Sequence, residues 1–185
     1  MRILIMNSTR NKSVAIVIAP QDFRDEEFKS PYQALNNNNI KTIIASTQIT
    51  QAKGMLGYSV QTQCLIKDLQ ADELMAIIVV GGMGSPTFLW NDEALHNLLK
   101  TMHLDKKLIC AICLSTVCLA NAGILSGICA TVWPSEDAIK ILIDHGVKYE
   151  DKPVIQDHNF ITANGPQSAQ DFAELIVTQL TKVKV

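Results

Sequence analysis

The sequence predicts an α/β fold in which a mainly parallel sheet is covered by helices on both faces. Apolar stretches at 14–19, 42–46, 76–80 and 108–112 are short and lack a polar alternation, as is typical of strands buried on both faces. Amphipathic segments separate these stretches, with apolar residues recurring about one helical turn apart. This alternation indicates strand–helix–strand units, whose ligand sites lie at the carboxyl ends of the strands.

Each remaining element follows from local signals. Residues 1–13 are predicted to be an N-terminal extension or an extra strand, and residues 14–185 a single domain. Before the fourth strand we expect, in order, a helix at 28–35 stopped by the asparagine run 36–39, an exposed strand or hairpin at 60–65, and a helix at 92–102. After it we expect a helix at 114–122, a strand at 129–132, a helix opened by Pro134, a hairpin at 154–162 and a last helix at 168–180.

The composition excludes several classes of protein. With 18% charged residues and a net charge of −2, the chain has no bulk basic surface for nucleic acid. Only four consecutive apolar residues follow Arg2, too few for the core of a signal peptide, and no stretch has the length of a membrane span. We therefore expect a cytoplasmic protein that binds neither nucleic acid nor a membrane.

The cysteines are predicted to be free thiols. They are Cys64, Cys110, Cys113, Cys118 and Cys129, and most lie inside apolar patterns, as thiols do in a reducing compartment. Cys110-x-x-Cys113 matches half of a zinc or redox motif. However, no second half-motif accompanies it, the four histidines lack ligand spacing, and Cys110 lies within a strand. We therefore expect no metal site.

An abrupt change from strand to helix marks Cys113 as the candidate reactive residue. Residues 107–112 have the pattern of a buried strand and residues 114–120 that of a helix, with almost no loop between them. A residue on such a turn is held out at the sheet edge, as the nucleophile elbow of hydrolases holds its serine. The free amides of the helix N-terminus favour a thiolate and can stabilise an oxyanion. The alternative is that Cys113 is one more buried thiol.

Two further loops should meet this elbow, because they also follow the carboxyl ends of strands. One is the acidic turn that contains Glu27, and the other is Gly81-Gly82. In this arrangement a Cys113 thiolate attacks a carbonyl, backbone amides near Gly82 and Leu114 hold the oxyanion, and a carboxylic acid moves the proton. The alternative for Glu27 is a solvated residue in the first turn of a helix. The alternatives for the glycines are a simple turn or a phosphate cradle, although their spacing fits neither the P-loop nor the full dinucleotide-binding motif.

These residues resemble the ThiJ/PfpI superfamily, which includes the parkinsonism-associated protein deglycase and the PfpI intracellular peptidases. The resemblance spans roughly residues 14–181. It is carried by Asp22-Phe23-x-Asp25-x-Glu27-x-x-x-Pro31-Tyr32, Gly81-Gly82, Ala111-Ile112-Cys113, Ala122-Gly123-Ile124-Leu125-x-Gly127 and Gly165-Pro166.

The resemblance implies a flavodoxin-like three-layer sandwich with a cysteine nucleophile elbow, no cofactor, and assembly as a homodimer or larger homo-oligomer. It implies Cys113 as the nucleophile, Glu27 as its protonated partner, and the backbone of Gly81, Gly82 and Leu114 as the oxyanion site. A neutral carboxyl group beside a thiolate lowers the pKa of the thiol. The same arrangement favours oxidation of the sulfur to a sulfinate.

The chain departs from the family at both of its histidine positions. PfpI-type members carry a histidine directly after the cysteine, where this chain has Leu114. Members closer to the parkinsonism-associated protein bring a histidine from a Thr-x-His-Pro segment, where Trp133 stands here. Trp133 either fills the volume of that histidine or marks a pocket reshaped for a hydrophobic ligand. Asn164 stands where many members have an arginine that contacts an anion.

We therefore expect a Cys/Glu enzyme of the deglycase or glyoxalase type, a hydrolase or lyase that acts on reactive carbonyls or glycated adducts in the stress response. Such substrates are already electrophilic, so the missing histidines matter least for them. The alternative is a non-enzymatic, redox-sensing or chaperone-like stress protein. A cysteine peptidase comes third, because peptide hydrolysis needs a base for the nucleophile and an acid for the leaving amine.

Overall fold

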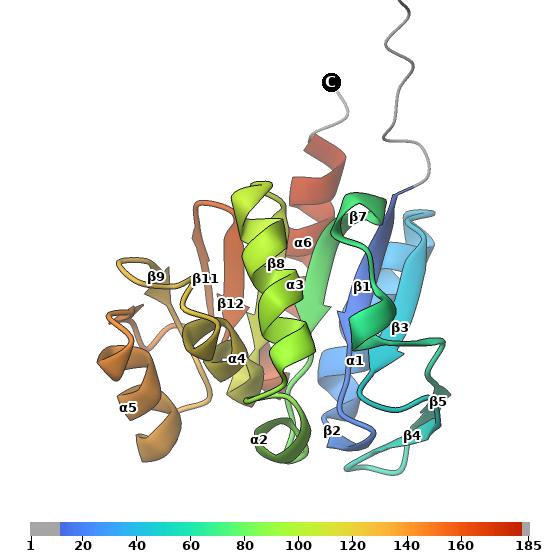
Figure 1. Cartoon of the computed structure of the whole chain (residues 1–185), viewed down its shortest axis with the longest axis horizontal. Coiled ribbons are helices and arrows are strands. Elements are labelled where there is room, and N and C mark those ends of the chain that lie inside the picture. Colours follow the sequence, from blue (N-terminus) through green and yellow to red (C-terminus); the bar gives the residue numbers. More distant parts are fainter. Residues whose placement is uncertain (1–11, 183–185) are drawn as a thin grey trace, which may run out of the picture.

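A seven-stranded sheet lies at the centre of residues 12–182, the part of the chain that the computed structural model describes (Figure 1). Its strand order is β11-β12-β8-β7-β1-β3-β6, and all neighbours are parallel except the antiparallel β11–β12 hairpin. The strands are β1 (Ser13–Val17), β3 (Thr42–Ser46), β6 (Cys64–Leu65), β7 (Leu74–Val79), β8 (Leu108–Ile112), β11 (Val154–Asp157) and β12 (Phe160–Ala163). The predicted mainly parallel α/β fold is confirmed.

Helices cover both faces of this sheet and make it the middle of three layers. In Figure 1, α3 lies in front of the strands, and α1 and α6, which pack against each other, lie behind them. The helices are α1 (Asp25–Asn37), α2 (Ser85–Phe88), α3 (Glu93–Leu104), α4 (Thr116–Asn121), α5 (Glu136–Asp144) and α6 (Ala169–Lys182). Single 3₁₀ turns are η1 (Ile66–Asp68), η2 (Ala71–Glu73), η3 (Cys113–Ser115) and η4 (Pro166–Ser168).

The central strands are buried because their apolar residues face helices on both sides. Val14, Ile16, Ile77 and Ile109 have no exposed surface, as expected of parallel strands between two helical layers. The predicted strands at 42–46 and 108–112 have the bounds of β3 and β8, whereas β1 ends at Val17 instead of 19. Residues 1–11, most of the predicted extension, lie outside the described residues.

Two small sheets lie beside the main sheet, and of their strands the sequence predicted β9 (Cys129–Ala130), which it placed at 129–132. One joins β2 (Gln21–Phe23), β4 (Gln51–Gly54) and β5 (Ser59–Gln61) at the carboxyl edge of the parallel strands, and the other pairs β9 with β10 (Lys148–Tyr149). The stretch 60–65 is therefore divided between the β4–β5 hairpin and edge strand β6.

Several helices begin at residues other than those predicted, and α1, expected at 28–35, begins at Asp25. The helix expected at 114 begins as a 3₁₀ turn at Cys113 and continues as α4. The helix expected to open at Pro134 begins at Glu136, because the Ser135 hydroxyl accepts the amide of Ala138 at 3.3 Å and so provides the N-cap. Among the described residues, none of the helices combines the length and the apolar character needed to cross a bilayer.

Candidate active site

A cavity of about 120 Å³ opens at the carboxyl edge of the sheet, where the loops after β1, β7 and β8 meet. It is lined by Arg24, Glu27, Met55, Gly82, Met83, Cys113, Leu114, Trp133 and Pro166. Glu27, Gly82, Cys113, Leu114 and Trp133 were among the predicted site residues, so the structure brings these parts of the chain together. The edge lies at the bottom of Figure 1, beside α2, β2 and β4.

Cys113 occupies a strained turn between β8 and the following helix. Its φ angle is +61°, in the left-handed region that residues other than glycine rarely adopt. The carbonyl of Cys113 accepts the amide of Trp133 at 3.3 Å, and only 6% of the residue is exposed. Gly81 leaves room for this turn, since a Cβ there would lie 2.6 Å from the Cβ of Cys113 and 2.7 Å from the oxygen of Ile112.

Glu27 places a buried carboxyl group beside that sulfur from the first turn of α1. It has no exposed surface, and its Oε2 accepts the amide of Gly81 at 3.0 Å. Its Oε1 makes no hydrogen bond within residues 12–182. Burial raises the pKa of Glu27 to about 8, against the opposing effects of the Cys113 thiol, the Gly81 amide and Arg24. With this pKa the carboxyl group is mostly protonated at neutral pH, and its role as the partner of Cys113 stays a prediction.

The Cys113 thiol differs from the sequence expectation of a lowered pKa. Burial raises its pKa, and a charged Glu27 raises it further, whereas the amides of Gly82 and Leu114 lower it. The physical reason is that the elbow holds the sulfur inside the cavity wall, where a thiolate loses most of its hydration. Because each of the two groups shifts the pKa of the other, their first ionisation belongs to the pair, which then exists as thiolate with carboxylic acid or as thiol with carboxylate.

The glycine loop supplies one of the two amides that face the sulfur. Gly82 has a φ of +104°, and a Cβ there would lie 2.4 Å from both the Arg24 nitrogen and the Asp22 oxygen. The loop is therefore pressed against the turn that precedes α1. Gly81, which the sequence grouped with the oxyanion donors, instead donates its amide to Glu27. Only the amides of Gly82 and Leu114 remain of that predicted group for an oxyanion.

Buried hydrogen bonds hold the elbow from behind. The Ser115 hydroxyl donates to the carbonyl of Val80 at 2.7 Å and lies 2.7 Å from the Ser85 hydroxyl. The indole of Trp90 donates to the carbonyl of Leu114 at 2.8 Å. These bonds tie the helix after Cys113 to the end of β7 and to the segment after α2. Sequence reasoning did not single out any of these partners, because their role depends on contacts between distant segments.

Trp133 both packs against the fold and lines the cavity, and its role in a pocket for a hydrophobic ligand stays a prediction. Its ring lies against Gly165, where a Cβ would come within 2.8 Å of the indole. Trp133 remains 39% exposed, and Met83 beside the cavity is 62% exposed. The rim of the cavity is therefore largely apolar.

Arg24 and Met55 are the cavity residues that sequence reasoning missed most clearly. Arg24 precedes Glu27 by three residues, and residues with this spacing lie on the same face of a helix. That spacing was the only feature of the sequence that could have placed Arg24 beside Glu27. Met55 lies in the turn between β4 and β5, which Asp25 fixes by accepting the amides of Leu56 at 2.9 Å and Tyr58 at 2.8 Å. No local pattern in the sequence predicts that contact.

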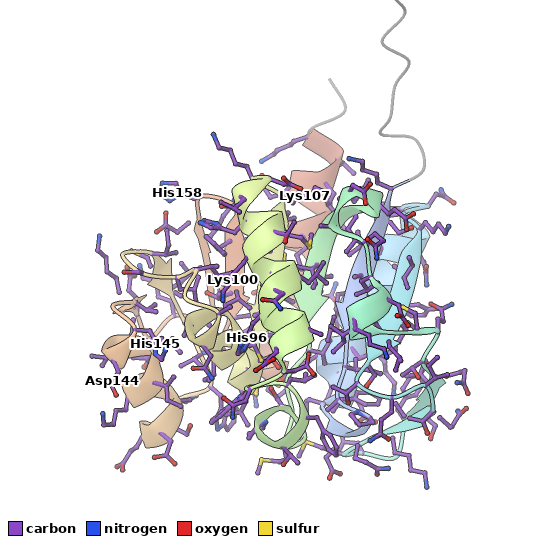
Figure 2. All side chains as sticks on the ribbon, in the orientation of Figure 1. His96, Lys100, Lys107, Asp144, His145 and His158 are labelled. Carbon is purple, nitrogen blue, oxygen red and sulfur yellow. The ribbon has the colours of Figure 1, made fainter. Side chains whose placement is uncertain are left out.

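No histidine lines the cavity, and all four lie within residues 12–182. Figure 2 shows His96 on α3, His145 beyond α5 and His158 in the β11–β12 turn, and the fourth, His103, lies 5.3 Å from the ring of Phe160. Asn164 accepts the Ser168 hydroxyl at 2.7 Å. Within the same residues, no group of three or more His, Cys, Asp or Glu side chains is arranged to hold a metal ion.

Comparisons with known proteins agree with this fold. The sequence matches the DJ-1/PfpI family over residues 12–179. It is 42% identical to an uncharacterized protein of Methanocaldococcus jannaschii, covering 94% of this chain and 84% of that one, and 26% identical to deglycase PfpI of Pyrococcus furiosus, covering 82% and 89%. The structure matches a ThiJ/PfpI domain protein from Brachyspira murdochii with a TM-score of 0.87 and 31% identity, over 92% of this chain and 98% of that one.

Proposed function

Since the chain belongs to the DJ-1/PfpI family, we propose that it is a deglycase- or glyoxalase-like enzyme in which Cys113 is the nucleophile and Glu27 carries protons. One observation supports this most strongly: a cysteine on a strained elbow lies against a buried carboxyl group with a pKa of about 8, in a small cavity. A general acid–base with a pKa near the working pH is suited to moving protons in both directions.

The first step is addition of the thiol to an aldehyde. The Cys113 sulfur attacks the carbonyl carbon and forms a C–S bond, and the carbonyl oxygen takes a proton to give a hemithioacetal. In the reactive form of the pair, the thiolate attacks and Glu27 is the acid that supplies the proton to the resulting oxyanion, which the Gly82 and Leu114 amides hold. No cofactor is needed for this step.

For a 2-oxoaldehyde the same pair can complete an isomerisation and hydrolysis. Glu27, now a carboxylate, removes the hydrogen of the former aldehyde carbon and returns a proton to the adjacent carbon, while the hydroxyl proton of the hemithioacetal moves to the former ketone oxygen; the product is a 2-hydroxy thioester. Water then cleaves the C–S bond, giving a 2-hydroxy acid and restoring the thiol. Methylglyoxal plus water becomes lactate, with no net oxidation.

The size of the cavity and its lining favour a small carbonyl over a peptide. A volume of about 120 Å³ is roughly ten times what one water requires, which suits a small molecule or the end of a modified side chain. Peptide hydrolysis would also need an acid for the leaving amine and a base for the thiol, and no imidazole lines the cavity within residues 12–182. We therefore do not propose a peptidase.

The second candidate is a non-enzymatic redox or chaperone-like stress protein. The observation that favours it is the same neutral carboxyl group, because a protonated Glu27 and the Gly82 and Leu114 amides would donate hydrogen bonds to the oxygens of an oxidised Cys113. A cytoplasmic location and a homodimer or larger homo-oligomer remain predictions under either function.

Lactate formation from methylglyoxal tests the enzymatic proposal. We expect saturable turnover by the wild type and its loss in Cys113→Ala and in Glu27→Gln, with Cys64→Ser as a matched control that removes a thiol outside the cavity lining. Turnover that survives in Cys113→Ala would overturn the proposal. Absence of turnover in the wild type, together with oxidation of Cys113 to a sulfinate by stoichiometric peroxide in intact-mass measurements, would favour the redox function.

A further inference from the structure

Arg24 is a cationic side chain in the wall of the cavity that contains Cys113. It directly precedes α1, and its backbone amide donates to the carbonyl of Gly81 at 3.0 Å, which anchors it to the glycine loop. Its side chain is 27% exposed and lines the cavity. Its charge acts on both Glu27 and Cys113, so the guanidinium lies close to the atoms proposed to react.

Only one edge of this guanidinium is used within the fold. Glu26 accepts hydrogen bonds from Nε at 2.8 Å and from Nη2 at 3.0 Å. Within residues 12–182 the Nη1 group makes no hydrogen bond, so the outer edge of the planar fork remains open. That edge presents two parallel N–H donors, a geometry that matches the two oxygens of a carboxylate.

The rest of the cavity lining carries no competing negative charge at neutral pH. Apart from Arg24, the ionisable residues of the lining are Glu27 and Cys113, and burial keeps both in their neutral forms. Met55, Met83 and Trp133 make the remaining rim apolar. A ligand with a reactive carbonyl at one end, a short aliphatic middle and an anion at the other end would therefore meet complementary groups along its length.

We propose that Arg24 makes this site selective for reactive carbonyl compounds that carry a carboxylate, bound with the carbonyl at Cys113 and the carboxylate on the open edge of the guanidinium. This inference rests on the proposed function and names its substrate class. Glu26 then weakens the preference of the site for anions, because it neutralises part of the charge of Arg24 and competes for its hydrogen-bond donors.

Alkylation of Cys113 measures this selectivity without any turnover. Iodoacetate and iodoacetamide have similar size and react alike, since the sulfur displaces iodide and forms a C–S bond, but only iodoacetate is an anion. The ratio of their rate constants at Cys113, determined by peptide mass spectrometry and divided by the same ratio for a small free thiol, cancels the thiolate fraction and the intrinsic reactivity. It reports the charge preference of the site alone.

Three variants of Arg24 and Glu26, together with one control, test whether Arg24 sets the iodoacetate-to-iodoacetamide ratio. Arg24→Gln should lower the iodoacetate-to-iodoacetamide ratio roughly two- to fivefold, the range that a partly exposed ion pair supplies. Glu26→Gln should raise the ratio, because it removes the negative charge that offsets the charge of Arg24 and weakens the competing hydrogen bonds. Arg24→Lys should give a ratio between those of the wild type and Arg24→Gln, because lysine keeps the charge but lacks the planar pair of donors. Lys53→Gln, which removes one positive charge from an exposed position of β4, is the matched control and should leave the ratio unchanged.

A substrate pair then tests the inference in turnover. The anionic 4,5-dioxopentanoate should have a higher kcat/KM than the neutral 2-oxopentanal in the wild type, and Arg24→Gln should remove that preference by raising KM for the anion. An alkylation ratio that is the same in the wild type, Arg24→Gln and Glu26→Gln overturns the inference even if methylglyoxal is converted. A ratio that changes as expected without conversion of any 2-oxoaldehyde upholds charge selection by Arg24 and overturns the proposed chemistry instead.

Discussion

Cys113 and Glu27 form a pair in which burial opposes the charge of either member. Cys113 is 6% exposed and Glu27 is fully buried, so the first proton to leave the pair leaves a poorly hydrated anion. The amides of Gly81, Gly82 and Leu114 compensate for part of this loss. The pair therefore holds both protons at pH 7 and loses one near pH 8, which is a property of the two residues together.

The pH dependence of alkylation should report this shared ionisation. We expect the rate of reaction of Cys113 with iodoacetamide to rise with a midpoint near pH 8, the pKa of Glu27 in the folded protein. In Glu27→Gln the midpoint should move upward, because the only remaining ionisation is that of a buried thiol. A downward shift in Glu27→Gln would instead mean that Glu27 is a resident negative charge at neutral pH. Cys129→Ser, which removes a thiol outside the cavity, should match the wild type.

The raised pKa of Glu27 also predicts how stability depends on pH. The folded protein keeps the proton on Glu27 up to about pH 8, whereas the unfolded chain loses it near the ordinary value of 4.5. Unfolding therefore releases a proton between these values, and stability that is fully present below pH 4.5 is lost as the pH rises to 8. Relative to Glu27→Gln, the free energy of unfolding of the wild type should fall by about 1.4 kcal/mol per pH unit in this window.

Urea denaturation of both proteins at several pH values measures this difference. The Gln variant is the reference because it keeps the shape of the side chain but cannot ionise, so all other titrating groups cancel in the comparison. A difference that stays constant from pH 5 to pH 8 would show that Glu27 is already charged in the folded protein.

At the scale of elements, the β4–β5 hairpin depends on one carboxylate from α1. Asp25 is 2% exposed and accepts the amides of Leu56 and Tyr58, and Gly54 leaves the space that its carboxylate fills. The turn thus fixed carries Met55 to the wall of the cavity. A contact in the first turn of a helix therefore positions one side of the candidate active site.

Asp25→Ala should both destabilise the fold and loosen that wall. It leaves the amides of Leu56 and Tyr58 without their charged acceptor, and because these hydrogen bonds are partly buried, the loss costs about 1–3 kcal/mol of unfolding free energy. We also expect faster alkylation of Cys113 in this variant under native conditions, because Met55 no longer covers the cavity. Asp151→Ala, which removes an exposed aspartate from a loop, is the control for both measurements. Unchanged stability in Asp25→Ala would contradict the role of this carboxylate.

The same hairpin shows why part of the fold could not be predicted from the sequence. The strands at 42–46 and 108–112 were predicted with their observed bounds because dense apolar runs specify buried parallel strands locally. The hairpin strand β4 has the sequence Gln-Ala-Lys-Gly and depends on Asp25, which contacts residues 31 and 33 positions away in the chain. No local pattern contains that information.

The candidate site was predicted to a similar extent and for similar reasons. Cys113, Glu27 and Gly82 follow strand ends, and strand ends of a parallel sheet meet at one edge, so their convergence could be inferred. The direction in which burial shifts the thiol pKa could not, because it depends on how deeply the elbow lies in the cavity wall. The role of Arg24 could not be inferred from the sequence either, because Arg24 and Glu26 together add nothing to the net charge.

At the scale of the whole molecule, the candidate site joins segments from the buried main sheet to a hairpin that is partly exposed. The Cys113 elbow continues β8, which lies between β7 and β12 in the main sheet, and the Gly81-Gly82 loop continues β7, whose last four residues have no exposed surface. Met55, which forms one side of the cavity, comes from the β4–β5 hairpin, where buried and exposed residues alternate in a three-stranded sheet. Regions with few buried apolar contacts open at lower free energy than the core does.

Hydrogen exchange should therefore divide the protein into two levels of protection. We expect the amides of β1, β7 and β8 to exchange only through global unfolding, and those of β4 and β5 to exchange earlier through local opening. A ligand in the cavity should slow the exchange of the hairpin amides, because it contacts both Cys113 and Met55 and so stabilises only the state in which the hairpin is folded against the cavity. Alkylation of Cys113 with iodoacetamide should accordingly slow exchange in β4 and β5 and leave β1 unchanged. Hairpin amides that exchange as slowly as those of β1 before alkylation would show instead that the cavity wall belongs to the core and that the site is rigid on all sides.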